Sequence, residues 1–372
     1  MRYLISCGGT GGHINPGLAI AGIIKEHDKD AEFLFVGTPD GMEATLVPAA
    51  GYRMEFVESA GFQRSFSPES IKRNLKAVRY LMTAGGHARK IVKEFQPCLA
   101  IGTGGYASGP VIRAAQQLGI PTAVHEQNAF PGVTNKLLAK KAKVVMMTFA
   151  EAEKYFPQGT HTVMTGLPVR DGMTKVNREQ ARRQLGFTEG MLIVSFGGSQ
   201  GAKCLNDMMP ELMQWHLESD MQINHIHAYG KHGRDTMPDE LKKRGIADDP
   251  RLRVTEYIHD MDICLAAADL VISRAGASTL SELEAVGRAS ILIPYPAAAE
   301  NHQYYNAMVL GKPGAAIVIE QKDLTIDVMK KHIESLYNDP EKRAAMHQRA
   351  GKLFLTDTND RIWQAIEGIR QT

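Results

Sequence analysis

The sequence Gly8-Gly9-Thr10-Gly11-Gly12-His13 follows the short apolar run Tyr3–Cys7 and leads into a helix-like segment. Far along the chain, Gly197-Gly198-Ser199-Gln200-Gly201-Ala202 follows the apolar run Leu192–Phe196 in the same way. A strand that turns through glycines into a helix leaves backbone N–H groups facing outward at the positive end of the helix dipole, which favours anions. One such turn is weak evidence. Two of them predict two similar domains that face each other with a phosphorylated ligand between them.

Length and composition agree with a two-domain globular protein. A chain of 372 residues is too long for one core, and its 44% hydrophobic and 23% charged residues are ordinary values. The net charge of +2 argues against nucleic acid as a partner, because no strong general attraction to it results. The charge is uneven, however: residues 1–166 carry 18 Lys/Arg and 13 Asp/Glu, whereas the remaining residues carry 25 and 28.

The cysteines and the chain start favour the cytoplasm. Cys7, Cys98, Cys204 and Cys264 lie far apart without metal-ligand spacing, as expected of buried thiols in a reducing compartment. The first apolar run leads directly into the glycine loop, so no signal segment is expected. No apolar stretch approaches the roughly 20 residues needed to span a bilayer. Contact with a membrane surface remains open.

Apolar, β-branched runs alternate with longer amphipathic stretches along the whole chain. Such runs, buried on both faces and separated by helices, are typical of parallel sheets in α/β domains. The expected strands lie near 2–7, 31–37, 98–102, 121–126, 143–148, 160–165, 191–196, 223–229, 251–257, 269–273, 289–294 and 315–319. The predicted division is an N-terminal domain over 1–166, a linker over 167–190 and a C-terminal domain over 191–357. A helix over 358–372 is expected to pack back on the N-terminal domain.

Two further glycine-rich loops follow predicted strands, at residues 102–110 and 274–279. Ligands of open α/β sheets bind beyond the carboxyl ends of the strands. Glycine in any one of these loops is equally well explained by a tight turn. Four such loops together favour ligand contact.

His13 stands where the first glycine loop meets its helix. An imidazole there could act as a general base near neutral pH, or it could simply satisfy local hydrogen bonds at a helix start; position alone does not decide. The loop completes neither a dinucleotide fingerprint nor a P-loop. Asn15 and Pro16 are explained as a helix N-cap and first helical residue.

Polar side chains also follow other strands. His125-Glu126-Gln127-Asn128 ends one strand, and all four are expected to point toward the same cleft. Glu282, in the first turn of a predicted helix, suits either the helix dipole or ribose hydroxyls. Glu300-Asn301-His302-Gln303 offers donors and acceptors for sugar hydroxyls.

No metal site is predicted. Asp260-Met261-Asp262 resembles a metal–diphosphate pair, but Asp260 is better explained as the cap of a helix over 261–268. His225 and His227 share a strand face, and His232 lies nearby, but no Cys or acidic ligand completes a site. A divalent ion such as Mg²⁺ could assist, although no ligand motif implies one.

A basic amphipathic segment lies in the first half of the chain. Residues 71–93 contain seven Lys/Arg and no acidic residue, and a second acid-free group comprises Lys136, Lys140, Lys141 and Lys143. Such a helix either contacts an anionic membrane or packs as an ordinary surface helix, and the local positive charge favours the membrane. The predicted membrane-contact residues are Ile71, Lys72, Arg73, Leu75, Lys76, Val78, Arg79 and Met82.

Taken together, these motifs resemble a family of bacterial peptidoglycan glycosyltransferases that add N-acetylglucosamine to a lipid-linked muramyl-peptide. The matching segments, in the family's order, are residues 8–17 (GGTGGHINPG), 104–110 (GGYASGP), 125–135 (HEQNAFPGVTN), 166–170, 197–202 (GGSQGA), 274–282 (RAGASTLSE) and 294–303. Leu167 departs from the family, which usually has Asn before this proline. Each segment alone is weak, but the set covers nearly the whole chain and is specific.

The resemblance implies two Rossmann-like domains of the GT-B type around a deep cleft, with the lipid acceptor and the membrane at the N-terminal domain and the UDP-sugar at the C-terminal domain. Thr10, Gly11 and Gly12 would lie against the donor and diphosphates, Asn128 near the donor sugar, Arg170 and Ser199 near the nucleotide phosphates, and Ile258 at uracil. Phosphate and ribose would contact Ala277, Ser278, Thr279, Leu280, Ser281 and Glu282, and Gln303 would bind the sugar. His13, or else Glu126, would be the catalytic base.

The resemblance also implies the reaction and the partners. N-acetylglucosamine would pass with inversion from UDP-N-acetylglucosamine to the 4-hydroxyl of the lipid-linked muramyl-peptide, without a covalent nucleophile. The enzyme would work in cell-wall biogenesis, cell shape and cell division, peripherally on the cytoplasmic side of the inner membrane, with a cell-wall synthesis or division complex as a candidate partner.

Three other classes remain: a UDP-sugar epimerase, a metal-dependent transferase using Asp260 and Asp262, and a non-catalytic nucleotide-regulated membrane adaptor.

Overall fold

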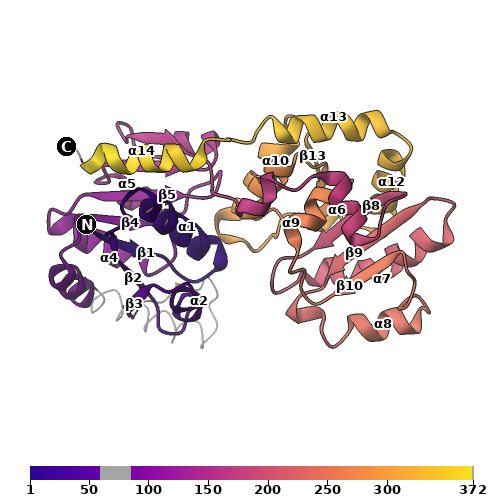
Figure 1. Cartoon of the computed structure of the whole chain (residues 1–372), viewed down its shortest axis with the longest axis horizontal. Coiled ribbons are helices and arrows are strands. Elements are labelled where there is room, and N and C mark those ends of the chain that lie inside the picture. Colours follow the sequence, from indigo (N-terminus) through magenta and orange to yellow (C-terminus); the bar gives the residue numbers. More distant parts are fainter. Residues whose placement is uncertain (59–84, 371–372) are drawn as a thin grey trace. The chain divides into compact units, whose positions relative to one another are not determined.

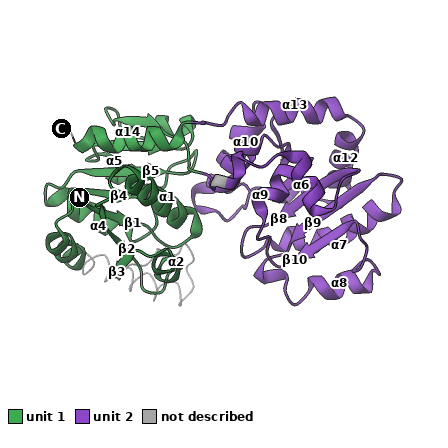
Figure 2. Ribbon diagram, viewed as in Figure 1, with its two compact units in different colours: residues 1–168, 357–372 green, residues 169–356 purple. Residues whose placement is uncertain are grey.

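The computed structural model describes residues 1–58 and 85–370. The chain forms two compact units, one made of Met1–Pro168 with Asp357–Thr372 and the other of Val169–Thr356 (Figure 1 and Figure 2). Each unit holds its own parallel sheet with helices packed against it. The predicted fold class, two parallel-sheet α/β domains, is confirmed.

Unit 1 contains a parallel sheet in the order β3-β2-β1-β4-β5-β6-β7. Each strand range predicted for this half contains a strand, and one strand, β3, was missed. The strands are β1 (Arg2–Ser6), β2 (Glu32–Gly37), β3 (Arg53–Phe56), β4 (Leu99–Gly102), β5 (Thr122–Glu126), β6 (Val144–Met147) and β7 (Thr162–Met164). β3 lies at the sheet edge and is only partly buried, so it lacks the apolar run that marks the central strands.

Alternate residues of β1 enter two different apolar cores. Leu4 packs with Val111 and Ile112, whereas Tyr3 and Ile5 pack in a second cluster on the other face. Successive side chains of a strand point to opposite faces of the sheet. Burial of both sets therefore means that both faces of β1 are covered. The helices of unit 1 are α1 (Gly11–His27), α2 (Glu43–Ala49), α4 (Ser108–Gln117), α5 (Val133–Ala139), the 3-10 helix η1 (Ala150–Tyr155) and α14 (Thr358–Arg370), with a further helical segment at 85–95.

The last helix, α14, belongs to unit 1 although it follows unit 2 in sequence (Figure 1). Ile362 and Ile366 are fully buried in the same apolar cluster as Tyr3 and Ile5. Trp363 stacks on His27 of α1, with ring centroids 4.5 Å apart. Burying these side chains removes apolar area from water and fixes the helix on the sheet.

Unit 2 contains a parallel sheet in the order β10-β9-β8-β11-β12-β13. Its strands are β8 (Met191–Phe196), β9 (Ile223–Ala228), β10 (Leu252–Thr255), β11 (Leu270–Ser273), β12 (Ser290–Leu292) and β13 (Ala316–Val318). Each lies within a predicted range. Its helices are η2 (Asp171–Thr174), α6 (Arg178–Leu185), α7 (Lys203–Glu218), η3 (Lys231–Gly233), α8 (Met237–Lys243), α9 (Met261–Ala267), α10 (Ala277–Val286), η4 (Ala299–Asn301), α11 (His302–Gly311), η5 (Gln321–Asp323), α12 (Ile326–Tyr337) and α13 (Pro340–Gly351).

The prediction of a linker over 167–190 is corrected by the structure, because all but the first two of these residues belong to unit 2. Arg182 of α6 is buried and donates to Asp269 at 2.8 Å and to the carbonyl of Gly190 at 2.6 Å. Asp269 also accepts the amide of Leu192 at 2.8 Å and pairs with Arg178. These donors to one buried carboxylate hold α6 against the sheet of unit 2. The helix therefore belongs to unit 2, and the units divide between Pro168 and Val169.

The start of α1 also differs from the prediction. The helix begins at Gly11 with Thr10 as its N-cap residue, so Asn15 is not the cap and Pro16 lies inside the helix. Proline cannot donate the usual bond to the carbonyl four residues earlier. Gly11 and Gly12 nevertheless lie in the first helical turn, in which Ile14 donates its amide to the Thr10 carbonyl at 3.2 Å, so His13 lies within the helix and not before it.

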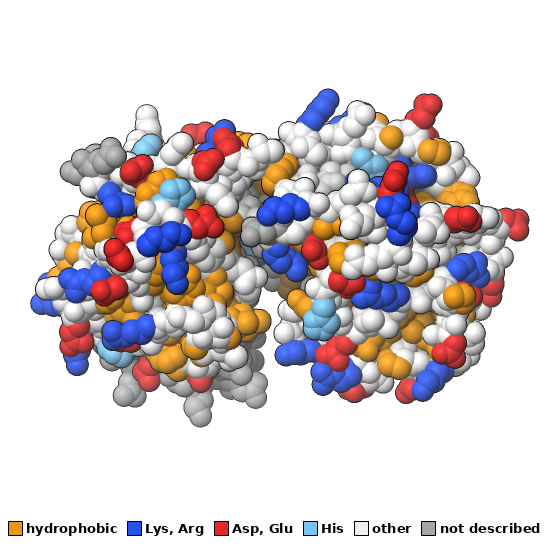
Figure 3. Space-filling model, in the orientation of Figure 1, with side chains coloured by type: hydrophobic (Ala, Val, Ile, Leu, Met, Phe, Trp, Pro, Cys, Tyr) orange, Lys and Arg blue, Asp and Glu red, His pale blue; other side chains and the backbone are white. Residues whose placement is uncertain are grey.

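Among the described residues, no helix is both long and apolar enough to cross a membrane. The predicted membrane-contact residues Ile71–Met82 lie outside the described part of the chain. On the face drawn in Figure 3, positive and negative side chains are interspersed over each unit.

Candidate active site

The four glycine-rich loops gather in pairs at the point in each sheet where strand order reverses. In unit 1, β1 lies between β2 and β4, so the loops after β1 and β4 are neighbours. In unit 2 the same holds for the loops after β8 and β11. Ligands of doubly wound sheets bind at this switch point, beyond the carboxyl ends of the strands. Each unit thus has one preferred ligand position, and the glycine loops form it.

The first glycine loop is held by Glu43, a residue that the sequence analysis missed. The buried carboxylate accepts the amide of Gly9 at 2.9 Å and both the amide and hydroxyl of Thr38, at 2.9 and 2.6 Å. Burial alone would raise the pKa of Glu43, but these hydrogen bonds outweigh it and lower the pKa. The Gly9 amide is therefore not available to an anion, and the first-turn amides of Gly11 and Gly12 remain for that purpose.

The loop after β4 needs its glycines because it passes directly beside His13. A Cβ on Gly104, which has φ of +100°, would lie 2.7 Å from His13 Nδ1. A Cβ on Gly105 would lie 2.2 Å from the carbonyl oxygen of Gly8. From the same loop, Thr103 donates its hydroxyl to the His13 carbonyl at 2.7 Å. The two glycine loops of unit 1 thus form one packed structure around His13.

His13 is half-buried and contacts the segment after β5 through its side chain. Its Nδ1 lies 3.0 Å from Gln127 Oε1. The prediction that residues 125–128 all point toward one cleft is wrong, because His125, Glu126 and Gln127 are buried. Gln127 contacts His13 and His125, whereas Glu126 turns to its own loop.

Glu126 holds the loop that follows it. Its two oxygens accept the amide and side-chain nitrogen of Asn128, at 2.9 and 3.1 Å, the amide of Gly132 at 3.2 Å and Asn135 Nδ2 at 2.8 Å. Burial raises the pKa of Glu126, and these donors oppose that rise. A carboxylate that is 1% exposed and accepts four N–H groups is well suited to fix Asn128 and poorly placed to reach a substrate.

The second glycine loop interlocks with the loop after β9. A Cβ on Gly201 would lie 2.0 Å from the carbonyl oxygen of Tyr229, and Asn206 Nδ2 donates to that oxygen at 2.8 Å. Ser199 is exposed at the tip of this loop, and α7 begins four residues after it with no side-chain cap. The helix start therefore leaves backbone donors for an anion beside Ser199.

The start of α10 brings together most of the other predicted donor-site residues. Ser278, Thr279 and Glu282 are partly exposed, whereas Ala277, Leu280 and Ser281 are buried and offer mainly their backbone. Arg170 reaches this turn and donates to Glu282 Oε1 from Nη2 at 2.9 Å and from Nε at 3.2 Å. Burial raises the pKa of Glu282, and Arg170 opposes that rise.

The two remaining predicted positions follow other strands of unit 2. Ile258, after β10, is 1% exposed and is largely a core residue. Gln303 Oε1 accepts the amide of Tyr295 at 3.0 Å, which ties α11 to the loop after β12. Glu300 and Asn301 beside it both have positive φ, 52° and 53°. Strained backbone of this kind is concentrated at functional sites.

The candidate metal ligands have other partners. Asp260 is the N-cap residue of α9, as predicted, but its side chain makes no capping hydrogen bond. The carboxylate instead pairs with Arg253 at 2.7 and 3.0 Å. His225 Nε2 and His227 Nδ1 both lie 2.7 Å from Ser195 Oγ inside the core. Within residues 1–58 and 85–370, no three His, Cys, Asp or Glu side chains are grouped to hold a metal ion.

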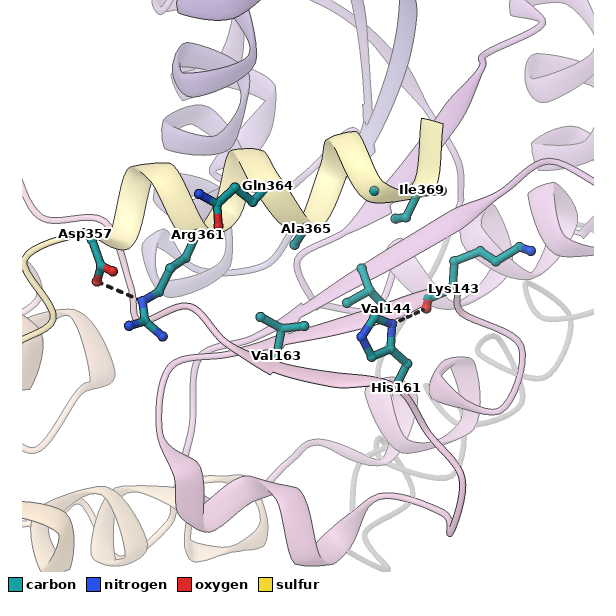
Figure 4. A pocket seen from close by; sticks show the side chains of 10 residues that line it. Lys143, Val144, His161, Val163, Asp357, Arg361, Gln364, Ala365 and Ile369 are labelled. Atoms are coloured by element: carbon teal, nitrogen blue, oxygen red, sulfur yellow. Dashed lines mark hydrogen bonds and ion pairs between the residues drawn. The ribbon is translucent and has the colours of Figure 1, made fainter. Parts of the chain in front are cut away.

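A cavity of about 650 Å³ lies between α14 and the strands β6 and β7 (Figure 4). Its lining includes the ion pair of Arg361 with Asp357 at 2.8 Å, and none of the predicted site residues. Lys143 and His161, also in the lining, directly precede the two strands. The cavity thus lies at the amino ends of β6 and β7, away from the loops described above.

Comparison with known proteins agrees with this arrangement. Residues 3–147 match the glycosyltransferase family 28 N-terminal domain, and residues 192–362 match the family's C-terminal domain. The chain belongs to glycosyltransferase family 28. These two matches cover both units, including all four glycine loops.

Two full-length relatives of this family 28 glycosyltransferase share the same name. A protein of Acetivibrio thermocellus is 45% identical over 370 residues, covering 99% of this chain and 98% of its own. One from Caldanaerobacter subterraneus is 42% identical over 99% and 100%. Both are called UDP-N-acetylglucosamine--N-acetylmuramyl-(pentapeptide) pyrophosphoryl-undecaprenol N-acetylglucosamine transferase. The crystal structure of Acinetobacter baumannii MurG aligns with a TM-score of 0.78 at 29% identity, covering 100% and 99%.

Proposed function

We propose that this glycosyltransferase moves N-acetylglucosamine from UDP-N-acetylglucosamine to the 4-hydroxyl of a lipid-linked N-acetylmuramyl-peptide, the step that forms lipid II in peptidoglycan synthesis. The observation that carries the proposal is the 45% identity over 99% of the chain to an enzyme of that name. The paired glycine loops support it, because each unit has an amide-lined ligand position. Two substrates, a nucleotide sugar and a lipid acceptor, need two such positions.

The donor nucleotide is assigned to unit 2. Ser199 and the starts of α7 and α10 supply hydroxyls and first-turn amides for the diphosphate. Glu282 supplies a carboxylate for ribose hydroxyls, and Arg170 lies beside it with its side chain 52% exposed. Ile258 and Gln303 are assigned to uracil and to the sugar. The charges on UDP thus meet donors, while its hydroxyls meet acceptors.

His13 of unit 1 is assigned as the base that takes the proton from the acceptor hydroxyl. Glu126, the alternative, is buried with four N–H donors on its oxygens. Its role in this proposal is to hold Asn128 near the donor sugar. An imidazole suits the base because its protonation changes near neutral pH. Attack by the activated hydroxyl displaces UDP directly and inverts the anomeric centre.

The leaving diphosphate is stabilised in this proposal by amides at helix starts and by Arg170. Donors aimed at developing charge in a site shielded from water lower the barrier strongly. No cofactor is assigned, because the residues that the structure describes hold no group of metal ligands that points to one.

Membrane association is assigned to unit 1, on the cytoplasmic side of the membrane that carries the acceptor. Its support is the acid-free basic segment over 71–93 and the exposed face of α5, where Val133 and Leu137 are 55% and 60% exposed beside Lys136 and Lys140. Exposed apolar residues among lysines favour an anionic bilayer surface. A cell-wall synthesis or division complex is proposed as a further partner on the family resemblance of the sequence alone.

The test is transfer of radiolabelled N-acetylglucosamine to a short-chain lipid-linked muramyl acceptor. We expect labelled product that depends on both substrates. Labelled N-acetylmannosamine formed from the donor without acceptor would instead indicate an epimerase. Complete loss of transfer with EDTA would indicate the metal-dependent class, and UDP binding without turnover would indicate an adaptor.

A further inference from the structure

Two side chains and a backbone carbonyl form a continuous hydrogen-bonded chain behind the proposed base. His125 Nε2 lies 3.2 Å from the carbonyl oxygen of Gly166, and Gln127 Nε2 lies 3.0 Å from His125 Nδ1. Gln127 Oε1 then lies 3.0 Å from His13 Nδ1. Gln127 is 2% exposed and His125 is fully buried, so water does not compete for these bonds.

The direction of every proton in this chain follows from backbone carbonyls. Gln127 Nε2 also lies 3.0 Å from the carbonyl oxygen of His125, which can only accept. This contact fixes the amide with its nitrogen toward His125 and its oxygen toward His13. At the other end, the Gly166 carbonyl requires the proton of His125 on Nε2. Burial lowers the pKa of His125 to about 4, so the ring is neutral and its Nδ1 accepts from Gln127.

The consequence concerns His13. Because Gln127 Oε1 can only accept, neutral His13 carries its proton on Nδ1, and its Nε2 keeps a free lone pair. Gly104 closes the same side of the ring, since its backbone leaves no room for a Cβ beside Nδ1. The remaining nitrogen, Nε2, is the one that can accept a proton from a substrate.

We propose that Gln127 is a positioning residue that holds His13 in the Nδ1–H tautomer, so that Nε2 is the proton acceptor in transfer. The inference rests on the proposed function, in which His13 is the base. A neutral amide performs the orienting task that a carboxylate performs in other His-based sites. The side chain of Gln127 does not contact the substrate in this role.

Two substitutions separate this role from simple packing. Gln127→Met keeps the length of the side chain but removes both the acceptor and the donor. Gln127→Glu keeps an acceptor oxygen for His13 in either protonation state, and the protonated form can still donate to the His125 carbonyl. Tautomers are read from the ¹⁵N shifts of a ¹⁵N-histidine-labelled protein near neutral pH, with the His13 signals assigned by comparison with His13→Ala.

We expect wild type and Gln127→Glu to show Nδ1 protonated and Nε2 bare at His13, whereas Gln127→Met gains the Nε2–H form. The value of kcat should fall roughly 10- to 1000-fold in Gln127→Met, with partial recovery in Gln127→Glu and little change in the donor KM. An unchanged His13 tautomer in folded Gln127→Met, or equal losses of kcat in both variants, would overturn the proposal. Wild-type protein that fails to transfer, yet shows the expected tautomers, would refute the proposed function and leave this geometry intact.

Discussion

Arg170 and Glu282, separated by 112 positions in sequence, form a close ion pair at the start of α10 with N–O distances of 2.9 and 3.2 Å. The sequence analysis assigned both to the donor nucleotide, one to phosphate and the other to ribose. In the described structure they bind each other. Their pairing places the cation proposed for the diphosphate next to the carboxylate proposed for the ribose. Arg170 also opposes the rise in the pKa of Glu282 that burial causes.

Removal of the cation tests this arrangement. We expect Arg170→Ala to weaken UDP binding roughly 10- to 100-fold, because charge-assisted hydrogen bonds are lost and Glu282 is left beside the phosphates. Uridine binding should change little if Arg170 contacts phosphate only. Titration calorimetry with both ligands measures this, with the exposed Lys175→Ala as the control. Equal weakening of UDP and uridine would instead place Arg170 in a supporting role for Glu282.

The proposed base is tested by His13→Ala. Turnover should fall by roughly 10²- to 10⁴-fold, the usual contribution of a general base, while UDP affinity changes by no more than a few-fold. The measurement is steady-state transfer together with UDP titration. His161→Ala, which removes an exposed histidine of the same unit, is the control. An unaltered kcat in His13→Ala would remove this residue from the mechanism.

The close passage of the β4 loop beside His13 predicts a specific sensitivity. Gly104→Ala places a methyl group 2.7 Å from His13 Nδ1, so the ring must move and kcat should fall roughly 10- to 100-fold. Gly119→Ala is a matched control, since Gly119 also has positive φ but has no atom within 4 Å of the added Cβ. Both variants should lose roughly 1–2 kcal/mol of stability from backbone strain. A comparable fall in kcat in both would show that strain, and not the contact with His13, is responsible.

The buried histidines of unit 2 predict loss of stability in acid. Burial lowers the pKa of His227 to about 4 and that of His216 to about 3, and the pKa of His225 also lies well below its usual value. The folded state keeps these rings neutral, whereas the unfolded chain protonates them near pH 6.5. Their contribution is therefore fully present above about pH 6.5 and is lost as the pH falls toward 4.

At pH 5 each such histidine should lower the free energy of unfolding by about 2 kcal/mol relative to pH 7. Urea unfolding at the two pH values should show His227→Asn with a smaller pH-dependent loss than wild type, by about that amount. The control is His161→Asn, which replaces an exposed histidine of unit 1. Identical pH dependence in His227→Asn and wild type would show that His227 is not held neutral.

The basic segment of unit 1 is tested by charge reversal. Replacing Lys72 and Lys76 by Glu should weaken partition onto vesicles of anionic lipid roughly 10-fold or more, since each basic residue near such a surface contributes about 1 kcal/mol. The control reverses Lys242 and Lys243, two exposed lysines of unit 2. Co-sedimentation with vesicles measures the partition. Equal partition of the two variants would show that this segment does not contribute to membrane binding.

The sequence by itself was sufficient for the secondary structure of the two sheets. Buried parallel strands are apolar on both faces, so their runs are visible without knowledge of neighbours, and each predicted range contains a strand. The exception, β3, is an edge strand with little burial, and its residues Arg53 to Phe56 alternate without an apolar run. Glycine loops after strands were equally visible, because a turn into a helix start has local requirements.

The tertiary structure decided what sequence spacing could not show. Strand order put the loops after β1 and β4 side by side, and only then did Gly104 become a neighbour of His13. Glu43 reaches Gly9 across 34 positions, and Gln127 reaches His13 across 114. The cap assigned to Asn15 was wrong because glycines can form a first helical turn themselves. Local propensity limits each segment to a few conformations, but hydrogen bonds between distant segments form only after the chain has folded, and these bonds orient the proposed base.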